Sequence, residues 1–127
     1  MIISTGIDIV EISRIKKASL QWKDRFLKRI FTDKEISYSK ERTYSYQHLA
    51  ARFAAKEAVL KAFGSGWNNR AEWTDIEIWN EKSGKPQVKL YRNLKTMQEK
   101  MGVGDIIISL SHTRTYAVAS AILFKKQ

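Results

Sequence analysis

The alanine-rich segment at residues 48–66 carries acidic and basic side chains in a spacing that could support chemistry. Glu57 and Lys61 lie one helical turn apart on a stripe that also holds alanines. Alanines let a neighbouring element approach closely, so Glu57 could be enclosed. The alternative is an ordinary surface ion pair, because a glutamate four residues before a lysine is the favourable order for such a pair on a helix. A carboxylate, three cations and small residues on a half-buried surface favour a site for phosphate and a metal ion.

Arg52 and Lys56 form a second pair one turn apart on the other flank of the same segment. Like charges at this spacing destabilise an isolated helix by roughly 0.2–0.5 kcal/mol. A bound anion between the two side chains would offset that cost, whereas two solvated side chains would need no ligand. Both interpretations stay open at this point.

Asp8 is the second candidate acid, because it interrupts the apolar run at residues 1–10. This run has largely apolar residues on both faces of its alternating pattern, which predicts a strand buried on both sides. A carboxylate in such a strand must be paired, hydrogen-bonded or bound to a cation. The alternative is that Asp8 lies at the end of the strand and caps the next turn.

A third polar group is formed by Ser109, Ser111 and His112, where the apolar strand predicted at residues 105–111 ends. Such positions often carry active-site residues. A single histidine at a hairpin is more often structural, so His112 is a candidate only if other groups converge on it.

Strands and helices in a mixed order must position these residues. Strands are predicted at residues 1–10, 73–80, 87–90, 105–111 and 116–124, and helices at residues 14–20, 22–30, 32–40, 48–63 and 91–101. This order predicts an α+β fold in which a mostly antiparallel sheet packs around a long central helix, in a single domain over residues 1–127.

Three local signals predict where helices begin and end. Ser13 is the expected N-cap of the first helix. Thr32 and Glu35 form a capping box that opens the third helix. Gly64 suits the left-handed position that closes the central helix.

Two segments have a predicted inner and outer side. In the second strand, Asp75 and Glu77 alternate with isoleucines, which predicts one buried and one wet face. Residues 14–29 carry seven basic residues against one acid, with Leu20 and Trp22 among the residues assigned to the inner side. The basic residues are Arg14, Lys16, Lys17, Lys23, Arg25, Lys28 and Arg29. A docking surface for an acidic helix and a merely solvated face account for this charge equally well.

The composition limits the classes of function. The 127 residues carry a net charge of +10, from 23 basic and 13 acidic residues, and so basic a surface attracts nucleic acid, anionic membranes, phosphorylated molecules or acidic proteins. The absence of cysteine excludes disulfides and thiolate metal sites. No apolar run approaches the ~18 residues of a membrane span, and the first residues do not resemble a signal peptide. We therefore expect a cytoplasmic protein that does not enter a membrane.

Three motifs in this order resemble one known family. They are GIDIV at residues 6–10, RFAAKEAVLKAFGSG at residues 52–66 and ISLSHTRTYAVA at residues 108–119, supported by FTDKE at residues 31–35 and GKP at residues 84–86. The combination is similar to the holo-acyl-carrier-protein synthases, a branch of the 4'-phosphopantetheinyl transferases. The motifs span nearly the whole chain.

The resemblance implies an activity and an assembly. Enzymes of this family move the phosphopantetheine arm of coenzyme A onto a serine of apo-acyl carrier protein and release adenosine 3',5'-bisphosphate, a step that serves fatty acid biosynthesis. Members of this length are expected to be homotrimers with active sites between neighbouring subunits. Asp8 and Glu57 match the family's metal ligands, which would hold Mg²⁺.

Further roles follow from the same resemblance. Lys61 is expected to neutralise phosphate charge or to protonate the leaving group, and His112 to orient phosphate or assist proton transfer. The general base is left open between Asp8 and a water on the metal. Contacts to coenzyme A are expected from Arg52, Lys56, Gly64, Ser65, Gly66, Lys85, Pro86, Ser109 and His112. The acidic carrier protein is expected to dock on Arg14, Arg25, Phe26 and Arg29.

Two other classes of function compete with this interpretation. A small basic nucleic-acid-binding domain would explain the net charge and the aromatic residues. It would not explain Asp8 and Glu57, which repel phosphate unless a metal lies between, and no nucleic-acid-binding motif is present in the sequence. A trimeric module that binds coenzyme A without catalysis is the other alternative.

Overall fold

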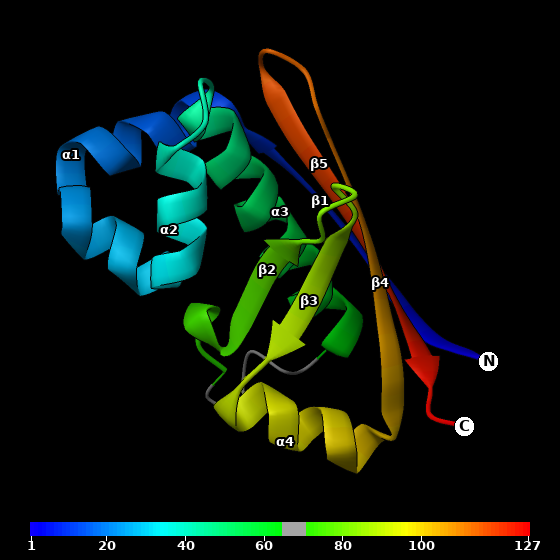
Figure 1. The fold of residues 1–127 in the computed structure, drawn as a ribbon. Helices are drawn as coiled ribbons and strands as arrows, with labels where there is room; N and C mark the ends of the chain where they lie inside the picture. The colour runs from blue at the N-terminus through cyan, green and yellow to red at the C-terminus, as the bar shows by residue number, and fades with distance from the viewer. Residues whose placement is uncertain (65–70) are drawn as a thin grey trace.

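A three-stranded antiparallel sheet and one long helix form the centre of the fold (Figure 1). The structure is a computed structural model, and it describes residues 1–64 and 71–127. The sheet has the order β1-β5-β4, formed by Ile2–Glu11, Tyr116–Lys125 and Val103–His112. Helix α3 at Ser45–Phe63 lies on one face of this sheet. The prediction of an α+β fold built around a long central helix is confirmed.

Strand β1 approaches α3 most closely at Gly6. A Cβ atom at this position would lie 2.0 Å from the carbonyl oxygen of Ala58 and 2.8 Å from the backbone nitrogen of Ala62. Only glycine leaves room for two backbones to come this close. The contact holds the inner face of β1, which includes Asp8 two residues further on, directly against the helix.

Helix α3 is enclosed on almost all sides, because the sheet covers one side and α1, α2 and β2 approach the others. It begins at Ser45, earlier than predicted, and ends at the expected stop before Gly64, whose φ of 73° and ψ of −115° are not the left-handed conformation that was predicted. The sequence predicted an apolar stripe and charged flanks. The structure instead buries Arg52 and Lys56 together with the apolar residues.

Helices α1 at Ile12–Ile30 and α2 at Asp33–Lys40 form a separate layer beside α3 (Figure 1). Helix α1 consists of two stretches joined at Lys23, whose φ of 49° and ψ of −130° are not helical, so two successive helices were predicted correctly. The capping box of Thr32 and Glu35 is confirmed. Ser13 is not the N-cap, because β1 leads directly into the helix and Glu11 takes that position.

The remaining elements form a hairpin and a final helix. Strands β2 and β3, at Ile76–Asn80 and Pro86–Leu90, pair antiparallel, and α4 at Arg92–Met101 ends at Gly102 with a φ of 70°. The first part of the predicted second strand is a short 3₁₀ helix, η2, at Trp73–Asp75.

The wet face predicted for the second strand is wrong, because Asp75 and Glu77 are both buried. Each has protein partners that replace water. Arg92 donates from Nε to Asp75 Oδ1 at 2.8 Å, and the Tyr91 hydroxyl donates to Glu77 Oε1 at 2.9 Å. The alternation in sequence was real, but both sides of the strand face protein.

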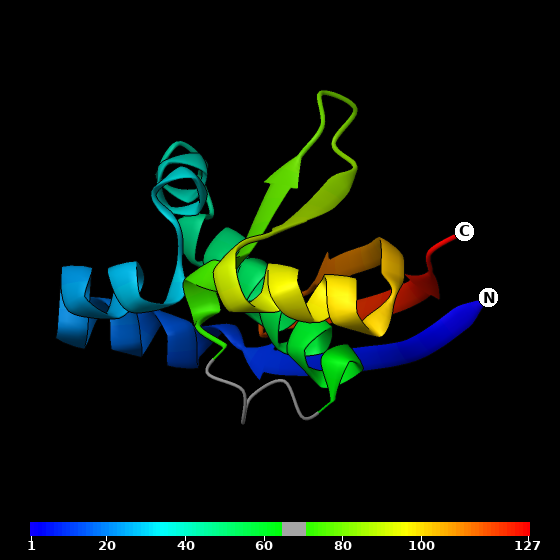
Figure 2. The same cartoon turned by 90° about the horizontal axis from the view of Figure 1, so that it is seen from below.

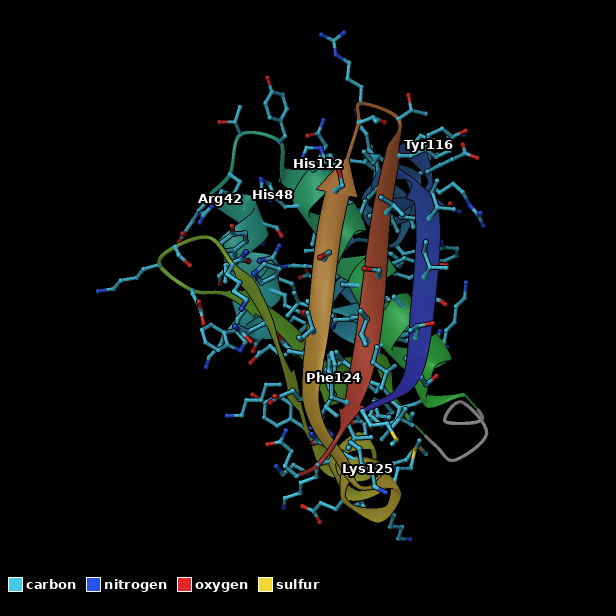
Figure 3. The ribbon with its side chains drawn as sticks, turned by 90° about the vertical axis from the view of Figure 1, so that its right-hand side faces the viewer. Arg42, His48, His112, Tyr116, Phe124 and Lys125 are labelled. Carbon is cyan, nitrogen blue, oxygen red and sulfur yellow. The ribbon has the colours of Figure 1, made fainter. Side chains whose placement is uncertain are left out.

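The face of the three-stranded sheet that points away from α3 is open and apolar (Figure 3). Ile7 and Ile9 of β1 are 65% and 63% exposed, so the prediction of a strand buried on both sides is wrong for the isolated chain. Burial alternates along β5 from Tyr116 to Phe124, so this strand has one buried and one outer side. Over the described residues, no helix has the length and apolar character that crossing a bilayer requires.

The two ends of the chain lie side by side at one end of the sheet, and α1 projects at the opposite end (Figure 2). The backbone nitrogen of Lys125 donates to the carbonyl oxygen of Met1 at 2.8 Å. The β2–β3 hairpin lies at the β4 edge of the sheet, where β3 contacts β4, and β2 also contacts α3. The fold therefore leaves the inner edge of β1 accessible between α1 and the end of α3.

Candidate active site

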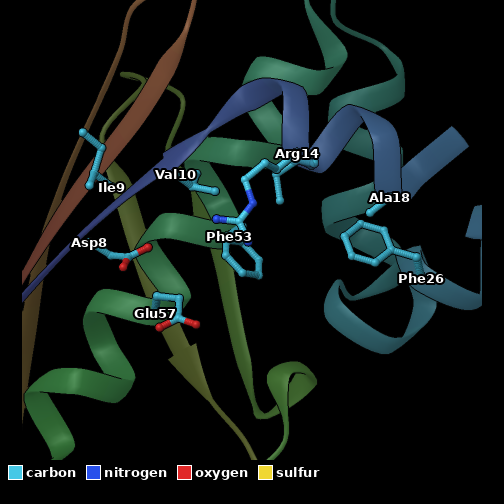
Figure 4. Close-up of a pocket in the computed structure, with 9 residues that line it drawn as sticks. Asp8, Ile9, Val10, Arg14, Ala18, Phe26, Phe53 and Glu57 are labelled. Carbon is cyan, nitrogen blue, oxygen red and sulfur yellow. The ribbon is translucent and has the colours of Figure 1, made fainter. Parts of the chain in front are cut away.

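Asp8 and Glu57 line one pocket between β1 and α3 (Figure 4), and Lys61 forms an ion pair with Asp8. Asp8 pairs with Ala119 of β5 across the sheet and directs its side chain toward the helix. Lys61 Nζ lies 2.9 Å from Asp8 Oδ1 and donates to the carbonyl oxygen of Ile7 at 3.1 Å. Two residues separated by nearly 50 positions in sequence, Asp8 and Glu57, thus face the same space.

The electrostatics of this pair are those of two carboxylates that share a site. Partial burial raises the pKa of Glu57, and the nearby charge of Asp8 raises it further, while Lys61 opposes both effects. A bound cation would remove the repulsion and offset the loss of hydration. The site therefore has a net demand for positive charge beyond what Lys61 supplies.

The residues present fit Mg²⁺ better than a metal that needs a full protein cage. Mg²⁺ is commonly held by one or two carboxylates, with waters and substrate phosphates completing its shell. Asp8 and Glu57 supply such a pair, and among the described residues no cluster of three or more acidic, histidine or cysteine ligands exists. A substrate phosphate would have to complete the coordination.

The two acids line a pocket of about 380 Å³ that extends along the first stretch of α1 (Figure 4). Phe53 lines the pocket next to Glu57, Phe26 lines it from the second stretch of α1, and Arg14 lies on its α1 side. The pocket thus combines a negative end, a cation and an aromatic wall. Of the residues predicted for carrier docking, Arg14 and Phe26 line this pocket, and Arg25 and Arg29 are exposed on the second stretch of α1.

Lys56 does not reach the site, and neither of the two interpretations left open for it, a bound anion or a solvated side chain, describes it. The side chain of Lys56 is fully buried and forms an ion pair with Glu35. Its Nζ also donates to the carbonyl oxygen of Ile30 at 2.7 Å. Burial lowers the pKa of Lys56, and the carboxylate of Glu35 opposes that shift. Protein groups therefore take the place of a ligand.

Arg52 belongs to a second group of residues near the other edge of the sheet. It donates to Asn80 of the hairpin, and its guanidinium lies 4.0 Å from the centre of the Tyr38 ring. The ring of His48 contacts both Tyr38 and His112, with centroid distances of 5.7 and 6.4 Å. This chain of contacts joins the hairpin to the end of β4.

His112 is therefore separated from the two acids within one chain. It lies on β4, the edge strand opposite β1, with β5 between them (Figure 3). The pKa of His48 beside it is lowered, first by burial and then by the positive charges of Arg52 and Arg42 and by His112. This second group is cationic, and a pocket of about 590 Å³ next to it is lined by Tyr44, Gln47, His112, Thr113 and Arg114.

The remaining predicted contacts to coenzyme A are spread over the chain. Ser109 is exposed on β4, and Lys85 and Pro86 lie at the start of β3 in the hairpin. Gly64 closes α3. Ser65 and Gly66 lie outside the described residues.

Some residues of interest were missed by the sequence patterns. Phe53 packs against the core and also lines the pocket, and the sequence did not mark it as a pocket residue. Leu20 and Trp22 were assigned to the inner side of α1 but are 58% and 51% exposed just before the turn at Lys23. A single helical period cannot show that a helix changes direction, so no signal in the sequence marked these two residues as exposed.

Comparison with known proteins decides the family. The profile described as the 4'-phosphopantetheinyl transferase superfamily matches residues 4–121. The chain belongs to this superfamily. A holo-[acyl-carrier-protein] synthase from Geobacter sp. (strain M21) is 46% identical over 123 residues, which cover 97% of this chain and 98% of the relative.

Solved structures of the family agree with the fold. The crystal structure of holo-[acyl-carrier-protein] synthase from Neisseria meningitidis matches with a TM-score of 0.89 and 31% identity, over 98% of this chain and 100% of that one. The Helicobacter pylori enzyme in complex with coenzyme A matches with a TM-score of 0.83 and 30% identity, over 94% and 99%. The resemblance drawn from the three motifs, and with it the class of enzyme, is confirmed.

Proposed function

We propose that this chain transfers 4'-phosphopantetheine from coenzyme A to a serine of apo-acyl carrier protein. The observation that carries the proposal is that Asp8 and Glu57 line one pocket beside a basic helix, with Lys61 paired to Asp8. The similarity to holo-[acyl-carrier-protein] synthases, including one in complex with coenzyme A, supports the same substrates. Transfer would serve fatty acid biosynthesis in the cytoplasm.

The chemistry requires charge neutralisation and proton transfer at a diphosphate. Asp8 and Glu57 would hold Mg²⁺, which when bound withdraws charge from phosphate oxygens. Lys61 would stabilise charge on the departing bisphosphate, because its ammonium is half-exposed and free to reorient from Asp8 toward a ligand. The serine proton would pass to the carboxylate of Asp8, which Lys61 already orders in the absence of substrate.

The basic surface of α1 would select the carrier protein. Arg14 lies at the pocket, and Arg25 and Arg29 extend the positive surface along the second stretch of the helix. Complementary charge guides encounter and fixes orientation more than it sets affinity. Leu20 and Trp22, exposed between these arginines, would add apolar contacts to an acidic helix of the carrier.

The active site would be completed by a neighbouring copy in a homotrimer. The second, cationic group around His112 and Arg52 lies at the opposite edge of the sheet from Asp8 and Glu57. The open outer face between these edges carries exposed apolar residues, including Ile107 and Tyr116. Covering this face with another copy would bury the apolar residues and bring the cationic group of one chain to the acids of the next.

The activity is tested by mass spectrometry. The protein, Mg²⁺, coenzyme A and an apo-carrier are mixed, and the carrier should gain the mass of phosphopantetheine. Glu57→Gln is the matched control and should give no gain. If coenzyme A binds but the carrier mass stays constant with the unaltered protein, the chain is a binding module and the proposed transfer is wrong.

The shared site has its own test by complementation. Glu57→Gln and His112→Ala should each be nearly inactive alone. When the two variants are co-expressed, mixed assemblies should regain part of the activity, because some sites combine an intact Glu57 with an intact His112 from another copy. Absence of any regained activity, or a monomeric mass by light scattering, would reject the shared site while leaving the transfer assay valid.

A further inference from the structure

A buried cation on α3 connects parts of the chain that form the wall of the pocket. The ammonium of Lys56 is enclosed and lies next in sequence to Glu57. It pairs with Glu35 at the start of α2, and it donates to the carbonyl oxygens of Ile30 at 2.7 Å and Trp73 at 3.3 Å. One side chain thus ties α3 to the end of α1, to α2 and to η2.

Glu35 extends this connection to the hairpin sheet. Its Oε1 accepts from the backbone nitrogen of Thr32, and its Oε2 accepts from the backbone nitrogen of Ile78 in β2, both at 2.8 Å. The side chains of Glu35 and Lys56 are both 0% exposed, so water does not compete for these bonds. Hydrogen bonds to a buried charge hold their partners firmly, because an unpaired charge in the interior is costly.

The first partner of Lys56 leads to one side of the pocket wall. The carbonyl of Ile30 is an otherwise open acceptor at the end of α1, where a cation is favourable. Phe31 follows directly, is buried under the ammonium at 5.4 Å and meets the ring of Phe26 edge to face at 6.3 Å. Phe26 lines the pocket.

The second partner leads to the other side of the same wall. The ring of Trp73, whose carbonyl oxygen accepts from Lys56, stacks on Phe53 with a centroid distance of 5.0 Å. Phe53 also lines the pocket and lies one helical turn before Glu57. Both aromatic residues that line the pocket with Asp8 and Glu57 are therefore contacted by groups that Lys56 binds.

We propose that the buried Lys56–Glu35 pair is a positioning device that holds Phe26 and Phe53, the aromatic wall of the pocket, in place beside the two carboxylates. This inference rests on the proposed function, because the wall is where the carrier's serine segment would enter beside Arg14. The pair touches neither substrate. The Asp8–Glu57–Lys61 group rests on the separate contact between β1 and α3 at Gly6, so binding of coenzyme A does not depend on the pair.

The test separates carrier recognition from binding of coenzyme A. In Glu35→Gln and Lys56→Met, kcat/KM for the apo-carrier should fall roughly tenfold to a hundredfold, because misplacing an aligned substrate costs about that much. The fall should appear mainly as a higher KM for the carrier, with an unchanged KM for coenzyme A. Leu94→Ala, a buried change in α4 away from the wall, is the control for loss of stability and should leave the carrier's KM unchanged.

A double-mutant cycle shows whether the pair acts through the wall. In the double mutant of Phe26→Ala and Glu35→Gln, kcat/KM for the carrier should fall by much less than the product of the two single-mutant factors. In the double mutant of Phe26→Ala and Leu94→Ala, the fall should equal the product of the two single-mutant factors. Assays are run at a temperature at which circular dichroism shows each variant folded. The proposal is overturned if the effects of Phe26→Ala and Glu35→Gln on kcat/KM simply multiply. It is also overturned if Leu94→Ala raises the carrier's KM as much as Glu35→Gln does. Failure of both pair variants to fold at any temperature overturns it too, since the pair would then serve folding alone.

If the unaltered protein does not transfer phosphopantetheine, the proposed function itself is wrong, and the positioning role falls with it. A protein that transfers phosphopantetheine but keeps its carrier KM in Glu35→Gln would leave the activity in place and remove only the positioning role.

Discussion

Helix α3 carries two lysine–carboxylate pairs that differ in their access to solvent. Lys56 and Glu35 are sealed, with both side chains 0% exposed. Lys61 and Asp8 lie at the pocket, where the lysine side chain is 52% and the aspartate side chain 15% exposed. The same pairing of residue types, little more than one turn apart on one helix, therefore has two different consequences.

The difference follows from what surrounds each pair. In the sealed pair every donor and acceptor is matched by protein groups, so neither partner can exchange its bonds for those of a ligand without leaving a buried charge. In the open pair the charges are hydrated in part, and such pairs contribute only about 0–1 kcal/mol to stability. A lysine held this loosely can turn toward a phosphate. Access to water, more than residue type, separates the structural pair from the functional one.

Removing the charge of Glu57 should have the largest effect on activity. Glu57→Gln keeps the size of the side chain but leaves Asp8 as the remaining acid of the pair, so Mg²⁺ would lose one of its two protein ligands. Because a bound metal supplies several kcal/mol of charge stabilisation, turnover should fall by about a hundredfold or more. The measurement is the rate of carrier modification at saturating coenzyme A, with circular dichroism as the check on folding. Wild-type rates with Mg²⁺ would contradict the assignment of Glu57.

Breaking the sealed pair should have the largest effect on stability. Lys56→Met leaves Glu35 as an uncompensated buried charge, which costs roughly 3–5 kcal/mol. Lys61→Met, the matched change in the open pair, should cost less than about 1 kcal/mol. Urea denaturation of both variants measures the difference. Equal losses of stability would mean that the two pairs do not differ in the way that their exposure indicates.

The glycine that joins β1 to α3 tests how the open pair is positioned. Gly6→Ala places a methyl group where 2.0 Å separates it from the carbonyl oxygen of Ala58, so the strand must move away from the helix. Overpacking of this kind costs about 1–3 kcal/mol. Because Asp8 would move away from Glu57, activity should fall further than stability does, by up to about a hundredfold. A variant with lower stability but normal turnover would show that Asp8 does not depend on this contact.

The sequence predicted the open group better than the sealed one, for a physical reason. Asp8 was recognisable because an acid in an apolar strand needs a partner, and Glu57 because it lies among alanines. Lys56 lies among the same alanines as Glu57, and Glu35 was recognised only as part of a capping box, so the sequence did not mark the two as partners. Their burial results from the packing of five elements, α1, α2, α3, η2 and β2.

The other errors have the same origin. Asp75 and Glu77 alternate with isoleucines as residues on a wet face do, but their partners Arg92 and Tyr91 come from a later part of the chain. The helix stop at Gly64 and the capping box at Thr32 were predictable because they depend on neighbouring residues alone. Local signals determine where elements begin and end, whereas burial of charge depends on contacts that are distant in sequence.

A charge reversal on α1 should affect carrier binding and spare the open pair. In Arg14→Glu the positive surface at the pocket becomes negative, so the apparent KM for the acidic carrier should rise about tenfold at low salt, and less at high salt where charges are screened. The KM for coenzyme A should change little, because the phosphates are expected beside Lys61. Lys95→Glu, an exposed change on α4, controls for the net charge. Equal carrier affinity at low salt in Arg14→Glu would contradict the docking surface.

The smallest expected effect concerns pH and the open pair alone. The pKa of Glu57 is raised in the folded chain, first by burial and then by the charge of Asp8, above the ordinary value of 4.5 that a glutamate has in the unfolded chain. The folded state therefore binds the proton more tightly, and its stability should fall as pH rises from 4.5 through the folded pKa. Glu57→Gln cannot lose this proton, so near pH 7 it should melt at a slightly higher temperature than the unaltered protein. The advantage should disappear below pH 4.5.

Mg²⁺ at neutral pH should raise the melting temperature of the unaltered protein and leave that of Glu57→Gln nearly unchanged, because the ion relieves the same repulsion between Asp8 and Glu57 that protonation relieves. A variant that melts below the unaltered protein at pH 7 without metal would show that the two carboxylates do not destabilise each other.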